Sequence, residues 1–157
     1  MQIKEILKIV LAIIVCQLAG LIGSVFTFSS INSWYSLLNK PFFNPPSWVF
    51  GPVWIILYTI MGISLYLIWN AKKSREKEKA IRIFGLQLFL NALWSILFFG
   101  LQIPWFAFIE IIILWTTIVL TIKVFLKVSK KAGYLLIPYL LWVSFATILN
   151  LAIAILN

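Results

Sequence analysis

Five apolar stretches, each long enough to cross a lipid bilayer, constrain this chain more than any other feature. A membrane-spanning helix needs about 20 mostly apolar residues, and residues 6–28, 48–69, 80–101, 105–126 and 132–156 meet that requirement. Alternating apolar and polar segments, as a membrane β-barrel would need, are not found. The sequence therefore predicts an all-α polytopic membrane protein, with residues 1–157 forming a single domain of five transmembrane helices.

The composition supports this interpretation and excludes several classes of function. Hydrophobic residues make up 63% of the chain and charged residues 11%, which is too apolar for a soluble enzyme of this size. The chain has no histidine and a single cysteine, Cys16. Imidazole bases, His-ligated metals and disulfides are therefore excluded, and we expect no metal site and no required cofactor.

Basic residues gather on one side of the expected bundle. Lys4 and Lys8 precede an apolar run without a small-x-small cleavage site, so we expect a retained span rather than a signal peptide. Only Lys40 falls on the opposite side. The positive-inside rule then places the N-terminus in the cytoplasm and the C-terminus outside, in a plasma (inner) membrane. We expect this side to contact membrane lipid and no nucleic acid. Its basic residues are Lys4, Lys8, Lys72, Lys73, Arg75, Lys77, Lys79, Arg82, Lys123, Lys127, Lys130 and Lys131.

One long connection, residues 29–47, joins the first two spans on the outer side. Its aromatic residues, including Trp34 and Tyr35, argue against disorder. Three prolines, Pro41, Pro45 and Pro46, stiffen the segment. Two interpretations remain open: an ordered lid over a pocket, or an aromatic belt at the membrane interface.

Helical spacing places aromatic and amide side chains on shared faces. Phe50, Trp54 and Tyr58 share one face of the second span, and Gln87, Asn91 and Trp94 share one face of the third. In the fifth span Trp142, Ala146, Leu149 and Asn150 repeat the pattern. Such faces are typical of a pocket for a flat apolar ligand. The amides are also consistent with hydrogen bonds that only hold helices together, and the residues alone favour this second interpretation.

Two further features allow more than one interpretation. Glu110 is the only acidic residue deep in a span, so it should face the bundle interior, either protonated or bonded to Gln87 or Asn91. Proton coupling or a ligand contact are possible roles. The first span carries a ridge of small residues, which could pack against a helix of the same chain or of a second protomer. The ridge consists of Ala12, Cys16, Gly20 and Ser24.

Several motifs in one order resemble the TspO/MBR family, the tryptophan-rich sensory proteins and translocator proteins. The first run reads KPFFNPPSWVFGPVW from Lys40 to Trp54, and the last reads PYLLWVSFATILN from Pro138 to Asn150. Between them the matches are Leu57-Tyr58, Met61-Gly62, Leu90-Asn91, Trp94-Ser95, Phe98-Phe99 and Glu110. Together they cover nearly the whole chain.

The resemblance implies a bundle of five transmembrane helices, often a homodimer, with a ligand pocket beneath the first connection. It implies a membrane receptor or sensor for tetrapyrroles, such as protoporphyrin IX or haem-like rings, and for isoquinoline or benzodiazepine-type ligands. The first connection then becomes a lid, and the aromatic faces line the pocket. The family's pocket positions correspond here to Ser24, Trp48, Val53, Trp54, Asn91, Trp94, Trp105, Trp142, Ala146 and Leu149.

The resemblance also implies two alternative functions and leaves one ligand class in doubt. Some relatives are thought to promote light-dependent porphyrin breakdown, for which Trp54 and Trp142 are the candidate residues. Ordinary acid/base or nucleophilic catalysis has no residues to perform it. Transport of porphyrins or sterols is the other alternative. The tyrosine and basic residue of the family's sterol-recognition pattern do not follow Leu149-Asn150, so sterol binding is in doubt.

Overall fold

The computed structural model describes residues 3–157, and every element of secondary structure in it is a helix. The five long helices are α1 (Ile3–Ser30), α3 (Phe50–Trp69), α4 (Arg75–Ser95), α5 (Pro104–Val128) and α7 (Ile137–Leu156). Shorter elements are α2 (Trp34–Leu37), α6 (Lys130–Leu135), a 3₁₀ turn η1 (Ser47–Val49) and a π-helical turn η2 (Ile96–Gly100). Within the described residues no strand occurs, so the predicted all-α fold is confirmed.

Five continuous helical segments are long and apolar enough to span a membrane: 3–30, 47–69, 75–100, 104–128 and 130–156. Three of them join a long helix to a short neighbour, namely η1 with α3, α4 with η2, and α6 with α7. They agree with the predicted spans to within a few residues. The largest difference is at α4, which begins at Arg75 rather than at Ala80. The Ser74 hydroxyl oxygen caps this helix by accepting a hydrogen bond from the Lys77 amide at 3.1 Å, a polar start signal that hydropathy does not detect.

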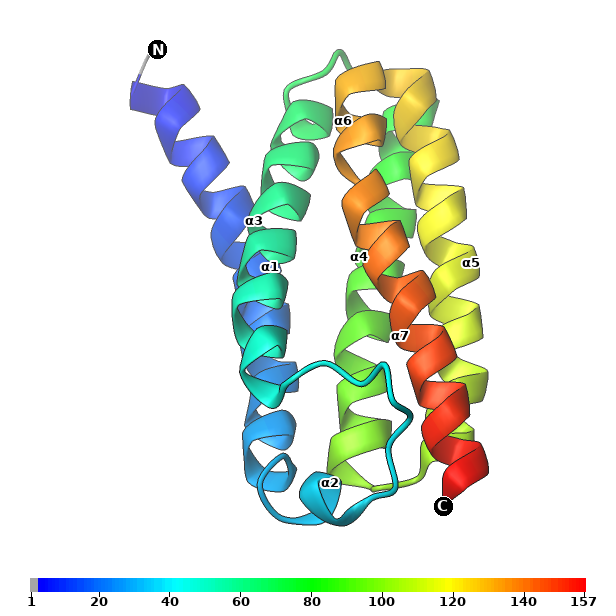
Figure 1. Cartoon of the computed structure of the whole chain (residues 1–157). Coiled ribbons are helices and arrows are strands. Elements are labelled where there is room, and N and C mark those ends of the chain that lie inside the picture. Colours follow the sequence, from blue (N-terminus) through cyan, green and yellow to red (C-terminus); the bar gives the residue numbers. More distant parts are fainter. Residues whose placement is uncertain (1–2) are drawn as a thin grey trace.

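The long helices pack as a ring around a common interior. α1 packs against α3 and α4, α4 against α5, and α5 against α6 and α7. The ring is completed where α6 and α7 meet α3. Figure 1 shows the first half of α1 leaning away from the other helices, while its second half stays within the bundle.

Three glycines lie where neighbouring helices approach each other closely. Gly62 of α3 lies directly against the backbone of Ile13 on α1, and a side chain at position 62 would overlap it. Gly20 of α1 lies against the ring of Tyr58, and Gly23 faces Ser95 of α4. At Gly20 the small-residue ridge of α1 thus packs against a helix of the same chain. Of the two interpretations of the ridge, packing within the chain therefore holds at this position.

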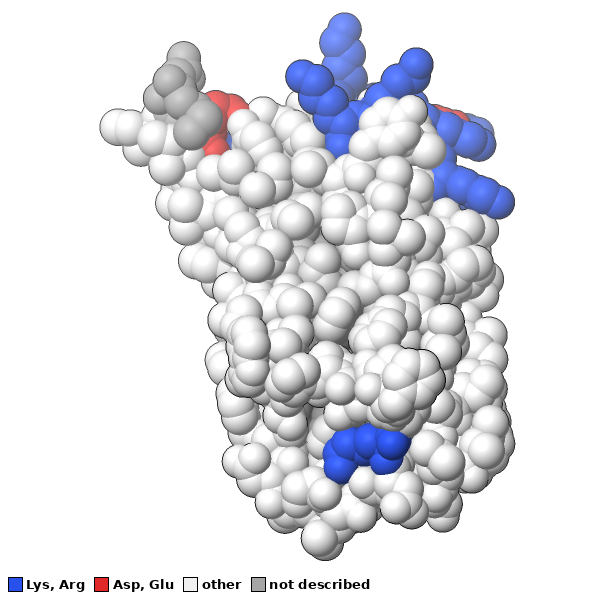
Figure 2. Space-filling model, viewed as in Figure 1, with Lys and Arg blue, Asp and Glu red and all other residues white. Residues whose placement is uncertain are grey.

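The charged residues are distributed as the sequence predicts. Figure 2 shows the basic side chains gathered at the end of the molecule that carries the α3–α4 and α5–α6 connections, with a small blue patch at the other end. The middle of the molecule in this view is free of charged surface. An uncharged band between polar ends is the surface that a bilayer requires.

The glycine contact between α1 and α3 gives a matched test. Changing Gly62→Ala should lower the Tm of the detergent-solubilised protein, with a destabilisation of about 1–3 kcal/mol, because the added methyl group overpacks the helix contact. Gly85→Ala is the control, since nothing lies within 4 Å of a Cβ there. That variant should keep or slightly raise the Tm. Equal Tm values for both variants would contradict the assigned contact.

Candidate functional site

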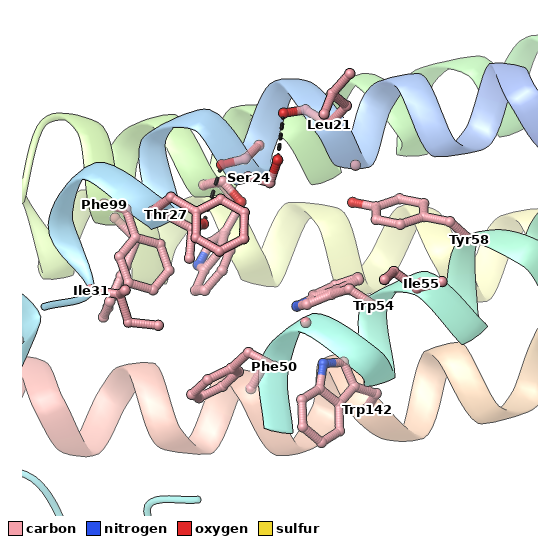
Figure 3. A pocket seen from close by; sticks show the side chains of 18 of the residues that line it. Leu21, Ser24, Thr27, Ile31, Phe50, Trp54, Ile55, Tyr58, Phe99 and Trp142 are labelled. Carbon is pink, nitrogen blue, oxygen red and sulfur yellow. Dashed lines mark hydrogen bonds between the residues drawn. The ribbon is translucent and has the colours of Figure 1, made fainter. Parts of the chain in front are cut away.

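A cavity of about 500 Å³ lies in the half of the bundle that carries the α1–α3 connection. Its walls come from α1, α3, α4, η2 and α7, with Tyr35 of α2 and Ser47 at the end near the connection. Figure 3 shows Phe50, Trp54 and Trp142 across the cavity from Ser24 and Thr27 of α1. The size is within the range of pockets that hold drug-sized ligands.

Six of the ten residues predicted for the pocket line this cavity. They come from four helices and are Ser24, Trp54, Trp94, Trp142, Ala146 and Leu149. Phe50, Tyr58, Phe98 and Asn150 line it too, as the helical faces indicated. The structure therefore brings together aromatic residues that are distant in the chain, from Phe50 to Trp142.

The other four predicted residues lie elsewhere. Trp48 is 74% exposed and Trp105 is 52% exposed, so that both indoles face outward from the bundle. Val53 packs against the central apolar core. Asn91 is buried behind the cavity wall, where it holds the wall residue Tyr58 in place.

Flat aromatic surfaces make up much of the wall. Trp54 stacks on Tyr58 with ring centroids 5.4 Å apart, and Trp94 stacks on Phe98 at 5.1 Å. Trp142 meets the ring of Phe50 edge-on at 6.2 Å. Such offset and edge contacts are favourable for aromatic pairs and hold the rings in fixed orientations. The cavity therefore presents preformed surfaces to a planar guest.

One polar atom of this wall lacks a partner. The indole nitrogen of Trp94 donates to the Asn150 side-chain oxygen at 3.0 Å. The indole nitrogen of Trp142 is buried and has no hydrogen-bond partner among residues 3–157. A buried N–H without an acceptor is costly. A ligand that brings an acceptor to Trp142 would remove that cost.

Behind the wall, a chain of hydrogen bonds joins three helices. The Tyr58 hydroxyl of α3 donates to the Asn91 side-chain oxygen of α4. The Asn91 amide donates to the Tyr139 hydroxyl of α7 at 2.8 Å, and that hydroxyl donates to the Gln87 side-chain oxygen at 2.8 Å. Gln87 and Asn91 therefore connect helices rather than line the cavity, as one of the two interpretations predicted. This chain fixes the position of the wall residue Tyr58.

The α1–α3 connection folds back over the end of the bundle. Tyr35 of α2 is 2% exposed, and its hydroxyl donates to the Asn44 side-chain oxygen at 2.6 Å. Burial raises the pKa of Tyr35 to about 12, so this donor keeps its proton at neutral pH. Phe42, by contrast, is fully exposed. The segment thus combines a buried tyrosine, as the lid interpretation expects, with an aromatic side chain that faces outward.

A second anchor ties this lid to the end of α7. The Asn39 backbone N–H donates to the Asn157 side-chain oxygen at 2.9 Å. The Asn157 side-chain amide donates back to the Asn39 carbonyl oxygen at 3.0 Å. The Asn39 side chain also donates to the Leu156 carbonyl oxygen at 3.3 Å. No local sequence signal predicts this pairing across the length of the chain.

Other lining residues were not predicted as site residues. Gly20, Thr27 and Ile31 line the cavity together with Ser24, and all four follow helical spacing on one face of α1. That spacing was a signal that could have extended the prediction beyond Ser24. Tyr35 and Phe145 also line the cavity. Phe145 lies three residues after Trp142 on the same face of α7, so helical spacing could have found it too. The position of Tyr35 depends on how the lid folds, for which the sequence pattern offers no guide.

Comparison with known proteins agrees with this architecture. The sequence profile of the TspO/MBR family matches residues 12–156. The chain belongs to the TspO/MBR family. It is 48% identical to the Tryptophan-rich protein TspO of Archaeoglobus fulgidus, with 98% of this chain and 99% of the relative covered. It is 44% identical to the Tryptophan-rich protein TspO of Chlorobaculum tepidum, with 98% of each covered. Identity to the human Translocator protein is 38%, covering 85% of this chain and 80% of the relative.

Membership of the TspO/MBR family and the five apolar helices establish an integral membrane protein. The match begins within α1 and ends within α7, so it includes the lid and every wall of the cavity.

The hydrogen-bonded chain behind the wall gives the second test. Changing Asn91→Leu should lower the Tm, because two buried tyrosine hydroxyls lose partners at a cost of about 1–3 kcal/mol. Thr116→Val is the control, since its exposed hydroxyl bonds only within its own helix, to the Ile112 carbonyl oxygen at 2.9 Å. The control should unfold at the wild-type temperature. A wild-type Tm for Asn91→Leu would show that the chain contributes little to stability.

Proposed function

We propose that this protein is a membrane receptor or sensor that binds planar tetrapyrroles, such as protoporphyrin IX, in the cavity beneath the lid. Relatives named Tryptophan-rich sensory protein and Translocator protein support a receptor or sensor role. The observation that carries the proposal is Trp142, which lines an aromatic cavity and whose buried indole N–H has no partner among residues 3–157. Aromatic surfaces with few polar contacts suit a flat, largely apolar ring.

The proposed binding mode assigns a different task to each part of the wall. Trp54 and Trp94 would offer indole surfaces to the ring, and Trp142 would donate its N–H to an acceptor on the ligand. Ala146 would leave room for the ring edge because its side chain is small. Isoquinoline and benzodiazepine-type molecules, which are also flat and carry few polar atoms, would use the same walls.

The cavity lining contains no Lys or Arg among the described residues. The carboxyl groups of a porphyrin would therefore meet no countercharge in the cavity and would bind there in the protonated form. Ser24 lines the cavity, and its hydroxyl donates to the Leu21 carbonyl oxygen at 2.8 Å. Its oxygen can still accept a hydrogen bond from a protonated carboxyl group.

Light-dependent porphyrin breakdown is the second candidate. Trp54 and Trp142 would stand against a bound ring, and indoles can exchange electrons with an excited porphyrin. Residues 3–157 bring no three metal-ligating side chains together, so such an activity would rely on the ligand's own photochemistry. Illuminating the complex and the Trp54→Phe, Trp142→Phe double variant tests this candidate, because bleaching equal to that in empty detergent would dismiss it.

Titration with protoporphyrin IX in the dark, followed by tryptophan quenching, tests the binding proposal. The wild-type protein should show saturable quenching, and the Trp54→Phe, Trp142→Phe double variant should bind about tenfold more weakly because it loses a hydrogen bond and indole contact.

The control for this titration is the Trp48→Phe, Trp105→Phe double variant, which also removes two indoles. Both of these face away from the cavity, so its affinity should equal that of the wild type. Linear quenching in all three proteins would mean that the ring only partitions into the micelle, and the proposal would fail.

The lid gives a kinetic prediction. Changing Asn157→Ala removes both hydrogen bonds between this side chain and the Asn39 backbone. Bound ligand should then leave about tenfold faster in a stopped-flow dilution, because the lid opens more readily. Asn32→Ala is the control, since Asn32 lies exposed in the same connection. Identical release from all three proteins would show that the Asn39–Asn157 contact does not limit ligand exit.

A further inference from the structure

Glu110 is a buried acid that neither the cavity nor the hydrogen-bonded chain accounts for. It lies on α5 and is 6% exposed. Both of its carboxyl oxygens are buried without a hydrogen-bond partner among residues 3–157. Gln87 and Asn91, its possible partners by sequence, bond to Tyr139 instead. The Gln87 side-chain nitrogen is also buried without a partner.

The depth of Glu110 in the bundle follows from the register between α5 and α7. The Asn150 side chain donates to the Pro104 carbonyl oxygen at 2.9 Å, which fixes the two helices at one level. At about 1.5 Å per residue, Glu110 lies about 9 Å further into the bundle along α5, and Tyr139 about 16 Å along α7. Glu110 therefore stands between the levels of Asn150 and Tyr139, well inside the apolar band.

The surroundings of Glu110 offer no countercharge. Among the described residues, the other buried titratable groups of the long helices are Tyr139 of α7, Tyr58 of α3 and Cys16 of α1, and none of these is a cation. The buried polar side chains of α4 are the amides Gln87 and Asn91. The basic residue of α5 nearest to this level, Lys123, is about 20 Å away along the helix. A carboxylate held in a membrane interior without a cation or donors is costly, so a neutral carboxylic acid is the form that fits this position.

The hydrogen-bonded chain reaches from this region to the cavity. Tyr58 lines the cavity, and Figure 3 shows its ring beside Trp54, while its hydroxyl bonds to Asn91 of α4. Every donor in the chain points in one direction, from Tyr58 to Asn91, then to Tyr139, then to Gln87. A charge near the far end would therefore act on three aligned dipoles, because hydrogen bonds in series polarise one another.

We propose that Glu110 is a proton-binding site inside the membrane, coupled through Tyr139, Asn91 and Tyr58 to the cavity wall. Its carboxyl group holds one proton when neutral and releases it to solvent when ionised. Ionisation would draw the Tyr139 hydroxyl proton away from Gln87 and disturb the bond that holds Tyr58. The ligand of this site is the proton alone, so the inference stands independently of tetrapyrrole binding.

Infrared spectroscopy tests the protonation directly. The chain has four acidic residues, namely Glu5, Glu76, Glu78 and Glu110, and the first three belong to the basic end of the molecule. At neutral pH the wild-type protein should show the carbonyl stretch of a neutral carboxylic acid, which ¹³C-glutamate labelling shifts. The band should disappear in Glu110→Gln and persist in Glu78→Gln. A wild-type spectrum without the band, or a band that Glu110→Gln retains, would overturn the proposal.

The same band tests the coupling. Tyr58→Phe should move its frequency or its titration midpoint, because the chain loses its first donor and the Asn91 oxygen loses its partner. Thr117→Val is the matched control, since it removes one hydroxyl from α5 that bonds only within its own helix, to the Ile113 carbonyl oxygen at 2.8 Å. Tyr139→Phe supplies a second variant should Tyr58→Phe fold poorly. A band that both tyrosine variants leave unchanged would refute the coupling.

Discussion

A polar group inside a bilayer must find its hydrogen-bond partner within the protein, because lipid offers none. The chain from Tyr58 through Asn91 and Tyr139 to Gln87 satisfies this constraint by joining α3, α4 and α7 at one level. Tyr139 is fully buried, and its hydroxyl both accepts and donates. The interior of the bundle is thus organised around polar contacts, since apolar contact alone does not distinguish a neighbouring helix from lipid.

This arrangement also determines the character of the cavity. The amides that could have pointed into it are used to connect helices, and Asn150 of the cavity wall is already bonded to Trp94 and to Pro104. What remains for a ligand is mainly aromatic surface, with the unused N–H of Trp142 and a few hydroxyl groups such as that of Ser24. Specificity would then arise from shape and stacking, with few directional contacts to set the orientation of the ligand.

Much of the fold could be predicted from the sequence, because span length and hydropathy have a direct physical cause in the thickness of the bilayer. The rotation of each helix about its own axis, which determines the side chains that face the cavity, was harder to predict. Trp48 and Trp105 resembled pocket residues, yet they face outward, and an indole in contact with lipid carries no penalty that would distinguish it from one in a cavity. The π-helical turn Ile96–Gly100 likewise has no counterpart in the apolar pattern. Asn91 was assigned to the pocket by resemblance, and only its partners on two other helices show that it supports the wall instead.

The contact between Asn39 and Asn157 links the lid to the last residue of the chain. Figure 1 shows the C-terminus at the same end of the molecule as α2, and the start of α1 at the opposite end. Any protein fused after residue 157 would therefore lie beside the lid and exert a mechanical force on it. A fusion placed before residue 1 would leave that end untouched, so that the choice of fusion site determines whether a reporter observes the cavity or disturbs it.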